Sequence, residues 1–321
     1  MTTTLTRLAD EVRSGLAAQP RVLSPRWLYD ANGATLFDEI TRLPEYYPYA
    51  AERAILEAHS GEIVATTMVP TIVELGSGRS EKTRLLLDAA IADGRLDRFV
   101  PFDVSNESLE EAADRLRQAY PGLRIDPVAG DFTDVLGPLR SPGRKMVVFL
   151  GGTIGNLYPA ERAEFLSNVG NLLRPGDWFL LGTDLVKSAD RLIAAYDDSM
   201  GVTAEFVRNS LRVLNREMDA DFDPYAFDYV PLWDGHEHRM DLRLRARDAQ
   251  HIHVTGAALD LDLAAGEEIR VEISTKFTHG QVRAELAAAG LSAYKTWTDP
   301  AGDFALTLAA SSSQDETPRT S

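Results

Sequence analysis

Between residues 71 and 187 the chain alternates short apolar stretches with longer amphipathic ones. The apolar stretches predict strands, and the segments between them carry apolar residues at helical spacing. The predicted strands are 71–75, 98–104, 123–131, 145–152 and 173–184. Strands that alternate with helices form a parallel sheet with helices on both faces. Ligands of such folds bind at the carboxyl ends of the strands, so the residues that follow each strand are the candidates for a site.

The alternation stops near residue 187, and a different pattern follows it. Residues 188–218 predict two helices, and residues 225–276 predict several longer strands of alternating character, for example HRMDLRLRAR and EEIRVEISTKF. A helix over 279–289 and two strands joined by a tight turn at 299–302 close the chain, which suits completion of the first sheet. We therefore expect an α/β fold in which an α+β insertion interrupts one doubly wound domain.

The domain boundaries follow from these two patterns. We expect residues 51–190 and 277–310 to form the doubly wound domain. The first 50 residues predict helices that pack with the insertion, so residues 1–50 and 191–276 are expected to form the second domain. The polar tail over 311–321 is expected to be disordered.

Composition excludes several functional classes. The net charge of −16 argues against nucleic acid and anionic membrane surfaces as partners, but not against a small cationic or zwitterionic substrate. The chain has no cysteine, which excludes disulfides, thiolate zinc sites and a cysteine nucleophile. No segment reaches the ~18 uninterrupted apolar residues of a membrane span, and the N-terminus lacks a signal-peptide core. We expect a cytoplasmic monomer.

A glycine turn follows the first predicted strand. Gly76, Ser77 and Gly78 form a Gly-x-Gly pattern, which is a weak signal because a purely structural turn also needs glycine. Acidic residues strengthen the signal: Asp103 ends the second predicted strand, and the pair Asp131-Phe132 ends the third. An acid at the end of the second strand can accept the ribose hydroxyls of an adenosine. An aspartate followed by an aromatic residue can bind the adenine amino group and cover its ring.

The third glycine of a dinucleotide-binding turn is absent, and this absence distinguishes two ligands. Ser80, Glu81 and Lys82 occupy the expected start of the following helix. Glu81 places an anion where a dinucleotide has its pyrophosphate, whereas Lys82 suits a single carboxylate. The pattern favours S-adenosylmethionine over NAD, and an NAD-dependent oxidoreductase is the alternative of another class. A non-catalytic adenosyl-binding module is a further alternative.

Longer motifs extend over both predicted domains. They are WLYDANGATLFDEITRLPEYYP (27–48), VELGSGRSEKTRLLLDA (73–89), VVFLGGTIGNL (147–157), LLGTDLVK (180–187), AYDD (195–198), NREMDADFD (215–223), AGEEIRVEISTKF (265–277) and WTDPAGDF (297–304). With these motifs the chain resembles, over nearly its full length, the histidine-specific S-adenosylmethionine-dependent methyltransferases of ergothioneine biosynthesis. The resemblance implies a Rossmann-like class I methyltransferase domain with an inserted α+β substrate-binding domain. It also implies trimethylation of the α-amino group of L-histidine to hercynine; a methyltransferase for another small amine or amino acid is the alternative.

The resemblance also implies the site residues. The cofactor positions are Gly76, Ser77, Lys82, Asp103, Asp131 and Phe132. The histidine positions are Tyr29, Phe37, Tyr46, Gly151, Asn156, Tyr196, Leu242, Glu272 and Ser274. Among these, Asn156 and Tyr196 match the carboxylate clamp, the first three aromatic residues match the pocket wall, and Glu272 and Ser274 match the pair that reads the imidazole. Leu242 stands where family members carry methionine, and Gly152 where they carry serine.

Methyl transfer from a sulfonium sets demands that these residues can meet. The reaction is an in-line displacement that needs no metal but requires an uncharged amine held at about 3–3.5 Å from the methyl carbon. Tyr29 is a candidate for ordering a water beside the amine, and Asn156 is the other catalytic candidate. Glu272 and Ser274 are two residues apart on a predicted strand, so both side chains lie on one face. The alternative for this pair is a solvated strand face.

Two histidine pairs are candidate metal ligands. His236 and His238, and likewise His251 and His253, can each place two imidazoles on one strand face. Neither pair has an acid or third ligand at convincing spacing in the sequence. Surface histidines, and no metal, are therefore expected.

Overall fold

The computed structural model describes residues 2–78, 80–104, 106–132, 136, 139 and 143–312, without the side chains of 2–7 and 106–108. The chain folds into two compact units. Unit 1 comprises Met1–Tyr47 and Lys187–Thr275, and unit 2 comprises Pro48–Val186 and Lys276–Ser321. At each point where the chain passes between the units, the boundary predicted from the sequence lies one to four residues after the observed boundary.

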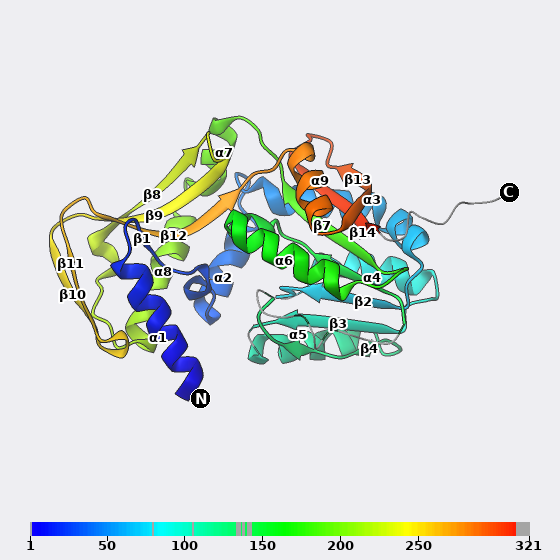
Figure 1. The fold of residues 1–321 in the computed structure, drawn as a ribbon, viewed down its shortest axis with the longest axis horizontal. Coiled ribbons are helices and arrows are strands. Elements are labelled where there is room, and N and C mark those ends of the chain that lie inside the picture. The colour runs from blue at the N-terminus through cyan, green and yellow to red at the C-terminus, as the bar shows by residue number, and fades with distance from the viewer. Residues whose placement is uncertain are drawn as a thin grey trace. The chain divides into compact units, whose positions relative to one another are not determined.

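Unit 2 is built on an eight-stranded sheet (Figure 1). Its strands are β2 (Thr71–Leu75), β3 (Arg98–Asp103), β4 (Arg124–Ile125), β5 (Val128–Ala129), β6 (Lys145–Phe149), β7 (Trp178–Asp184), β13 (Leu291–Thr298) and β14 (Phe304–Ser311). The order is β13-β14-β7-β6-β2-β3-β4, and β5 pairs with β3. Neighbouring strands from β4 to β7 are parallel, whereas β14 is antiparallel to β7 and β13 to β14. The predicted α/β class is confirmed, and the closing strand pair completes this sheet as expected.

Alternating side chains of the central strands bury both faces of this sheet. In β2, Ile72 belongs to one hydrophobic core and Val73 to the other, and the same alternation recurs in β3 and β6. The first core includes residues of α3 (Tyr47–Thr67), α4 (Thr83–Ala92) and α5 (Asn106–Ala119). The second includes residues of α6 (Pro159–Leu172) and α9 (His279–Ala288). Helices therefore cover both faces, which is the doubly wound arrangement.

The strand order places a ligand site at the end of β2. From β2 the chain adds β3 and β4 on one side, and then β6 and β7 on the other. The order thus reverses between β2 and β6, and open α/β sheets bind ligands at such a switch point, beyond the carboxyl ends of the strands. The glycine turn at 76–78 lies directly at this position.

Three local predictions for unit 2 were wrong. Helix α3 was not predicted, although it is the longest described helix. The single strand expected over 123–131 is two short strands, β4 and β5, separated by Pro127, which has no N–H to donate to a sheet ladder. The tail was expected to begin at 311, but Ser311 ends β14 and pairs with Leu291. Residues 313–321 lie outside the described part of the chain.

Unit 1 is an α+β structure, as the sequence predicted for the insertion. Its sheet has the order β1-β12-β9-β8, and β10 and β11 form a separate two-stranded ribbon. These strands are β1 (Arg21–Val22), β8 (Phe227–Asp234), β9 (Arg239–Ala246), β10 (Gln250–Val254), β11 (Leu259–Leu263) and β12 (Glu268–Thr275). The helices are α1 (Thr2–Ala17), η1 (Pro25–Leu28), α2 (Ala31–Ile40), α7 (Ala189–Tyr196), α8 (Val202–Glu217), η4 (Pro224–Ala226) and η5 (Thr255–Ala257).

One core holds unit 1 together. Alternate residues of β9 (Met240, Leu242 and Leu244) are buried with Val207 and Leu211 of α8. The ribbon joins the same core through alternate residues of its two strands.

Among the described residues, no helix is both long and apolar enough to cross a bilayer.

A buried ion pair joins the first residue of β6 to the residue before β7 and generates a stability prediction. Lys145 Nζ lies 2.6 Å from Asp177 Oδ2, with both side chains at most 2% exposed. Asp177 also accepts the backbone N–H groups of Lys145 and Arg174, each at 2.9 Å. We expect Asp177→Asn to lower the free energy of unfolding by about 3–5 kcal/mol, because it leaves a buried ammonium unpaired.

Urea unfolding measures this loss. The control is Glu57→Gln, which removes the exposed partner of Arg53 and is expected to change the free energy of unfolding by about 1 kcal/mol at most. Equal effects of the two substitutions would contradict the importance of the buried pair.

Candidate functional site

The glycine turn of unit 2 connects the ends of β2 and β3. Gly76 and Gly78 have φ angles of +64° and +48°, a region that glycine adopts without strain. The Ser77 N–H donates to the carbonyl of Phe102 at 3.1 Å, and the Gly78 N–H donates to Asp103 Oδ2 at 2.9 Å. The structure thus brings together three of the residues that the sequence assigned to the cofactor: Gly76, Ser77 and Asp103.

The hydroxyl of Ser77 provides a test of whether a cofactor fits this turn. Ser77 is 5% exposed, and its Oγ has no hydrogen-bond partner among the described residues. A buried hydroxyl left unpaired costs about 1–3 kcal/mol. A polar ligand group at the turn would remove this cost, so the residues present fit a cofactor that carries a carboxylate or hydroxyl here.

The pair Asp131-Phe132 lies beside the same turn. Ala129 of β5 is paired with Asp103, and the Gly130 N–H donates to the Asp103 carbonyl at 2.9 Å. A Cβ built on Gly76 would lie 3.8 Å from Cε1 of Phe132. The half-exposed Phe132 ring also packs on Phe149, with ring centroids 5.1 Å apart. The ends of β2, β3 and β5 therefore converge, as the adenosine interpretation requires.

Lys82 has a partner that the sequence analysis missed. Its ammonium forms an ion pair with Glu52 of α3, whose side chain is fully buried. Both carboxylate oxygens of Glu52 also lie 2.9 Å from the Gly151 N. Glu52 thus connects the segment after the glycine turn with the segment after β6. The stretch AAERAILEA contains two glutamates and does not distinguish Glu52 as the buried one, and α3 itself was not predicted.

The segment between the glycine turn and α4 also differs from the prediction. The helix was expected to begin at Ser80, but it begins at Thr83. Ser80 has a φ of +52° and is buried, with its hydroxyl donating to Glu74 Oε2 at 2.7 Å. The Thr83 hydroxyl donates to the other oxygen of the same carboxylate. Through these two bonds Glu74 fixes the segment that connects the glycine turn to α4. Burial raises the pKa of Glu74 to about 7.

In unit 1, aromatic residues predicted for the substrate pocket form a continuous series. Ring centroids are 5.8 Å apart for Tyr29 and Phe37, 6.3 Å for Phe37 and Tyr46, and 6.1 Å for Tyr46 and Tyr196. Phe206 of α8, which the sequence analysis missed, packs on both Tyr29 and Phe37. The series joins residues of α2, α7 and α8 with Tyr29, which follows η1, and Tyr46, which precedes α3; Tyr29 at one end is exposed.

Buried polar groups lie at the Tyr196 end of this series. The Tyr196 hydroxyl donates to Ser274 Oγ at 2.8 Å, and the Tyr229 hydroxyl donates to the Tyr196 carbonyl at 2.8 Å. Burial, with a further contribution from the Glu272 charge, raises the pKa of Tyr229 well above its usual value. Glu272 and Ser274 are 8% and 7% exposed, so the alternative of a solvated strand face is wrong.

The remaining predicted substrate residues lie in both units. Leu242 of unit 1 is directly opposite Glu272 in the β9–β12 ladder, and its side chain belongs to the apolar core. Gly151 and Asn156 of unit 2 follow β6, and Asn156 ends η3 (Thr153–Asn156) with its side chain half-buried. Gly152 has a φ of +67°, which a serine at this position would adopt only with strain.

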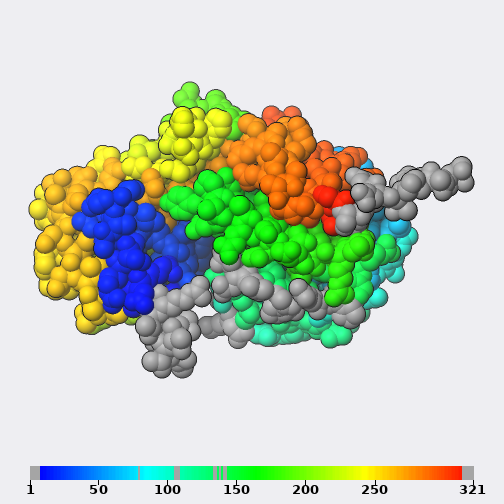
Figure 2. All heavy atoms as spheres, viewed as in Figure 1, coloured from blue at the N-terminus to red at the C-terminus, as the bar shows by residue number. Residues whose placement is uncertain are grey.

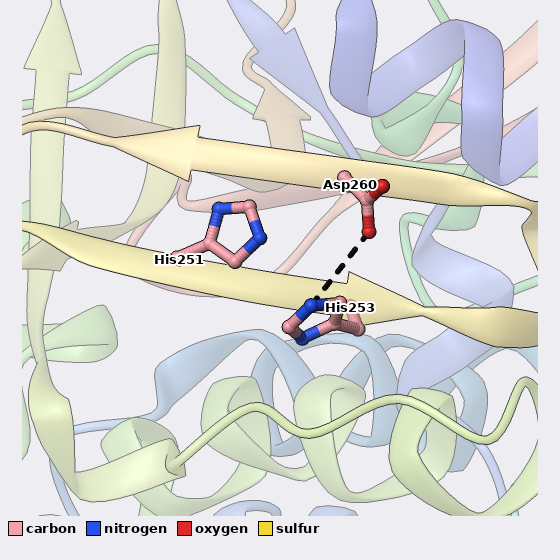
Figure 3. Close-up of side chains that lie close together, drawn as sticks. All are labelled: His251, His253 and Asp260. Atoms are coloured by element: carbon pink, nitrogen blue, oxygen red, sulfur yellow. Dashed lines mark ion pairs between the residues drawn. The ribbon is translucent and has the colours of Figure 1, made fainter.

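One histidine pair has more potential ligands than the sequence suggested. Within the described residues, one group of three or more side chains is suitably placed to hold a metal ion: His251, His253 and Asp260 (Figure 3). The fold thus brings Asp260 to His251 and His253 as a third potential ligand, which the spacing in the sequence did not indicate. All three side chains are exposed.

Comparison with known proteins identifies relatives over most of the chain. Residues 8–311 match the family described as histidine-specific methyltransferase, SAM-dependent. A histidine N-alpha-methyltransferase of Mycolicibacterium smegmatis is 55% identical over 302 residues, which are 94% of each chain. One of Mycobacterium tuberculosis is 52% identical over 303 residues, again 94% of each chain. Ergothioneine biosynthesis protein 1 of Neurospora crassa is 34% identical over 203 residues, which are 61% of this chain and 23% of that protein.

The raised pKa of Glu74 makes a prediction about stability. The folded protein holds this proton up to about pH 7, whereas the unfolded chain releases it near 4.5. The folded state binds more protons in this window, so Glu74 lowers stability as the pH rises from 4.5 through 7. Glu74→Gln removes the titration, so we expect the stability of the variant relative to the parent to rise by more than about 1 kcal/mol between pH 5 and pH 8.

Chemical denaturation at several pH values tests this expectation. The control is Glu164→Gln, the same substitution at an exposed position of α6, which is expected to change the free energy of unfolding by about 0.5 kcal/mol at most. A Glu74→Gln difference that is constant or falls with rising pH would show that Glu74 is ionised in the folded protein.

Proposed function

The chain belongs to the family of histidine-specific, S-adenosylmethionine-dependent methyltransferases, and from this membership we propose that it methylates the α-amino group of L-histidine three times. The product is hercynine, and the reaction is a step of ergothioneine biosynthesis. The observation that carries the proposal for the substrate is the buried group of Glu272, Ser274 and Tyr196. A buried carboxylate with two hydroxyls suits a ligand that has N–H donors and a carboxylate, as histidine has.

The cofactor residues have separate roles in this proposal. S-adenosylmethionine, when bound, supplies an electrophilic methyl group on its sulfonium. The unpaired Ser77 hydroxyl and the Lys82 ammonium bind the methionine carboxylate, with Glu52 fixing the position of Lys82. Asp103 accepts the ribose hydroxyls, while Asp131 and Phe132 bind the adenine. Gly76 brings the backbone of the turn close to the ligand.

The hydroxyls of Tyr196 and Ser274 divide the recognition of histidine between them. Each hydroxyl has one proton, so Tyr196 can donate to the substrate carboxylate only when Ser274 donates to Tyr196. The Ser274 oxygen and Glu272 then each accept one N–H of the ring, so the substrate is bound as the imidazolium, in which both nitrogens carry a proton. A site that uses such groups discriminates by about 10⁴-fold or more against an amino acid that lacks the imidazole nitrogens.

The amine must be uncharged when it is methylated. A free α-amino group has a pKa of about 7.7–8.0 and is mostly protonated at neutral pH. We assign Tyr29 to ordering the water that takes up this proton and Asn156 to holding the substrate carboxylate. Phe37, Tyr46 and Leu242 form apolar walls, and Gly151 leaves room for the substrate. Anchors on the carboxylate and the ring leave the amine free to rotate between the three transfers.

Other properties of the enzyme follow from its charge and substrate. We infer a monomer that acts on a small molecule in the cytoplasm, without a nucleic-acid or membrane partner. The net charge of −16 supports this inference, because it opposes binding to phosphate backbones and anionic lipid.

Mass spectrometry tests the reaction directly. The protein is incubated with S-adenosylmethionine and a panel of amino acids, and the mass of each is followed. We expect the mass of three methyl groups on histidine alone. A gain on another amine with histidine unchanged would contradict the substrate, and no gain on any amine would contradict the activity.

Glu272→Ala tests the assignment of the imidazole site. We expect it to weaken histidine binding by about 10²-fold or more, because the partner of a buried N–H is lost, and to leave S-adenosylmethionine affinity within about 2-fold. Calorimetry with each ligand measures both. The matched control is Glu217→Ala at an exposed end of α8, which is expected to change neither. Equal loss of both affinities in Glu272→Ala would contradict the assigned role.

A further inference from the structure

Two histidines and two aspartates face one another across the β10–β11 ribbon. His251 is directly opposite Asp262, and His253 is directly opposite Asp260. Directly opposite residues of an antiparallel pair share a face of the sheet, and so do residues two apart on one strand. Figure 3 shows both imidazoles and the Asp260 carboxylate together on this exposed face. One ligand atom from each of His251, His253 and Asp260 lies within 4.8 Å of the others.

Carboxylates already hold the imidazoles in a metal-binding orientation. His251 Nδ1 lies 2.6 Å from Asp262 Oδ1, and His253 Nδ1 lies 3.0 Å from Asp221 Oδ2. A carboxylate accepts a proton from Nδ1, so the neutral imidazole presents an unprotonated Nε2. Metal-ligating histidines in proteins carry this same outer contact, which fixes the ring and its tautomer. His253 Nε2 is 3.9 Å from Asp260 Oδ1.

We propose that His251, His253 and Asp260 bind a divalent transition-metal ion of the zinc class on the outer face of the ribbon. Imidazole nitrogen and carboxylate oxygen are zinc ligands, and they bind at about 2.0–2.2 Å. The ligand atoms must close by roughly 1 Å to reach one ion at these bond lengths, which exposed side chains achieve by small rotations. Water completes the coordination.

The ion would add a cross-link between segments that strand pairing and the core of unit 1 already bring together. A two-stranded ribbon is marginally stable by itself, and the ligands come from both of its strands. Asp221 links the segment after α8 to this site, because it accepts the backbone N–H of His253 at 2.7 Å and also contacts the His253 ring. None of the residues assigned to methyl transfer lies on β10 or β11, so this site is separate from the proposed catalytic function and does not depend on it.

Calorimetric titration with zinc tests the proposal on the full chain. The protein must carry no histidine tag, and L-histidine and S-adenosylmethionine are left out because both chelate zinc. We expect one saturable site per chain. His251→Gln, His253→Gln and Asp260→Asn are each expected to weaken zinc binding by about 10-fold or more, and Asp262→Asn by about 10–100-fold through the orientation of His251.

The matched control is His236→Gln. His236 is also an exposed histidine with Nδ1 beside a carboxylate, at 3.1 Å from Glu237, but it lies in the β8–β9 turn outside the cluster. We expect the His236→Gln variant to bind zinc with the same affinity as the parent. A second readout is thermal unfolding, which zinc should shift upward in the parent and in His236→Gln but not in His253→Gln.

Two results would overturn the proposal. One is the absence of saturable zinc binding in the parent chain. The other is unchanged zinc affinity in both His251→Gln and His253→Gln, with circular dichroism showing that the variants are folded.

Discussion

The buried carboxylate of Glu52 is the interaction on which the order of the cofactor region depends. It pairs with Lys82 and accepts the Gly151 N–H, so three segments meet at one side chain: α3, the residues before α4 and the loop after β6. A buried carboxylate is retained only when its charge is paired and its oxygens accept hydrogen bonds. These requirements fix where Lys82 and Gly151 lie. The Gly78 N–H also donates to Asp103, so the geometry of the site depends on several segments at the edge of the sheet and not on the glycine turn alone.

The architecture of unit 2 was predictable because its signals are local and repeated. Each central strand is a short apolar run, and each following helix has apolar residues on one side, so the alternation could be read without knowing the contacts. The predictions for unit 2 were wrong where tertiary contacts override the local sequence signal. Helix α3 begins within the stretch LPEYYPY, and a run of proline and tyrosine of this kind typically ends regular structure. The positive φ of Ser80 is maintained by its bond to the buried Glu74, and nothing in the neighbouring sequence announces that partner.

The grouping of the residues proposed for the cofactor was predictable for a related reason. Parallel strands end at one edge, so Asp103, Asp131 and the glycine turn could be brought together from topology before any coordinates. The residues proposed for the substrate could not be grouped in this way. Tyr196 and Ser274 are 78 positions apart and meet through a hydrogen bond between α7 and β12. Composition and periodicity carry no signal for such a pair, and only the resemblance to a family singled it out. Phe206, which belongs to the same aromatic series, was missed because an aromatic residue on an amphipathic helix looks like any other core residue.

Two pairs of polar residues in unit 1 illustrate what separates a strand pattern from a site. Glu272 and Ser274, and likewise His251 and His253, are two apart on a strand, and in the sequence each pair has a solvated strand face as its simplest interpretation. The two pairs differ in how far their side chains are buried. The side chains of the first pair are enclosed, and buried polar groups of this kind are held by hydrogen bonds rather than by solvent. The second pair is exposed, and its potential to bind an ion comes from the opposite strand, which places Asp260 and Asp262 across from the two rings. Strand register, which a single sequence does not state, therefore decides which polar pairs become sites.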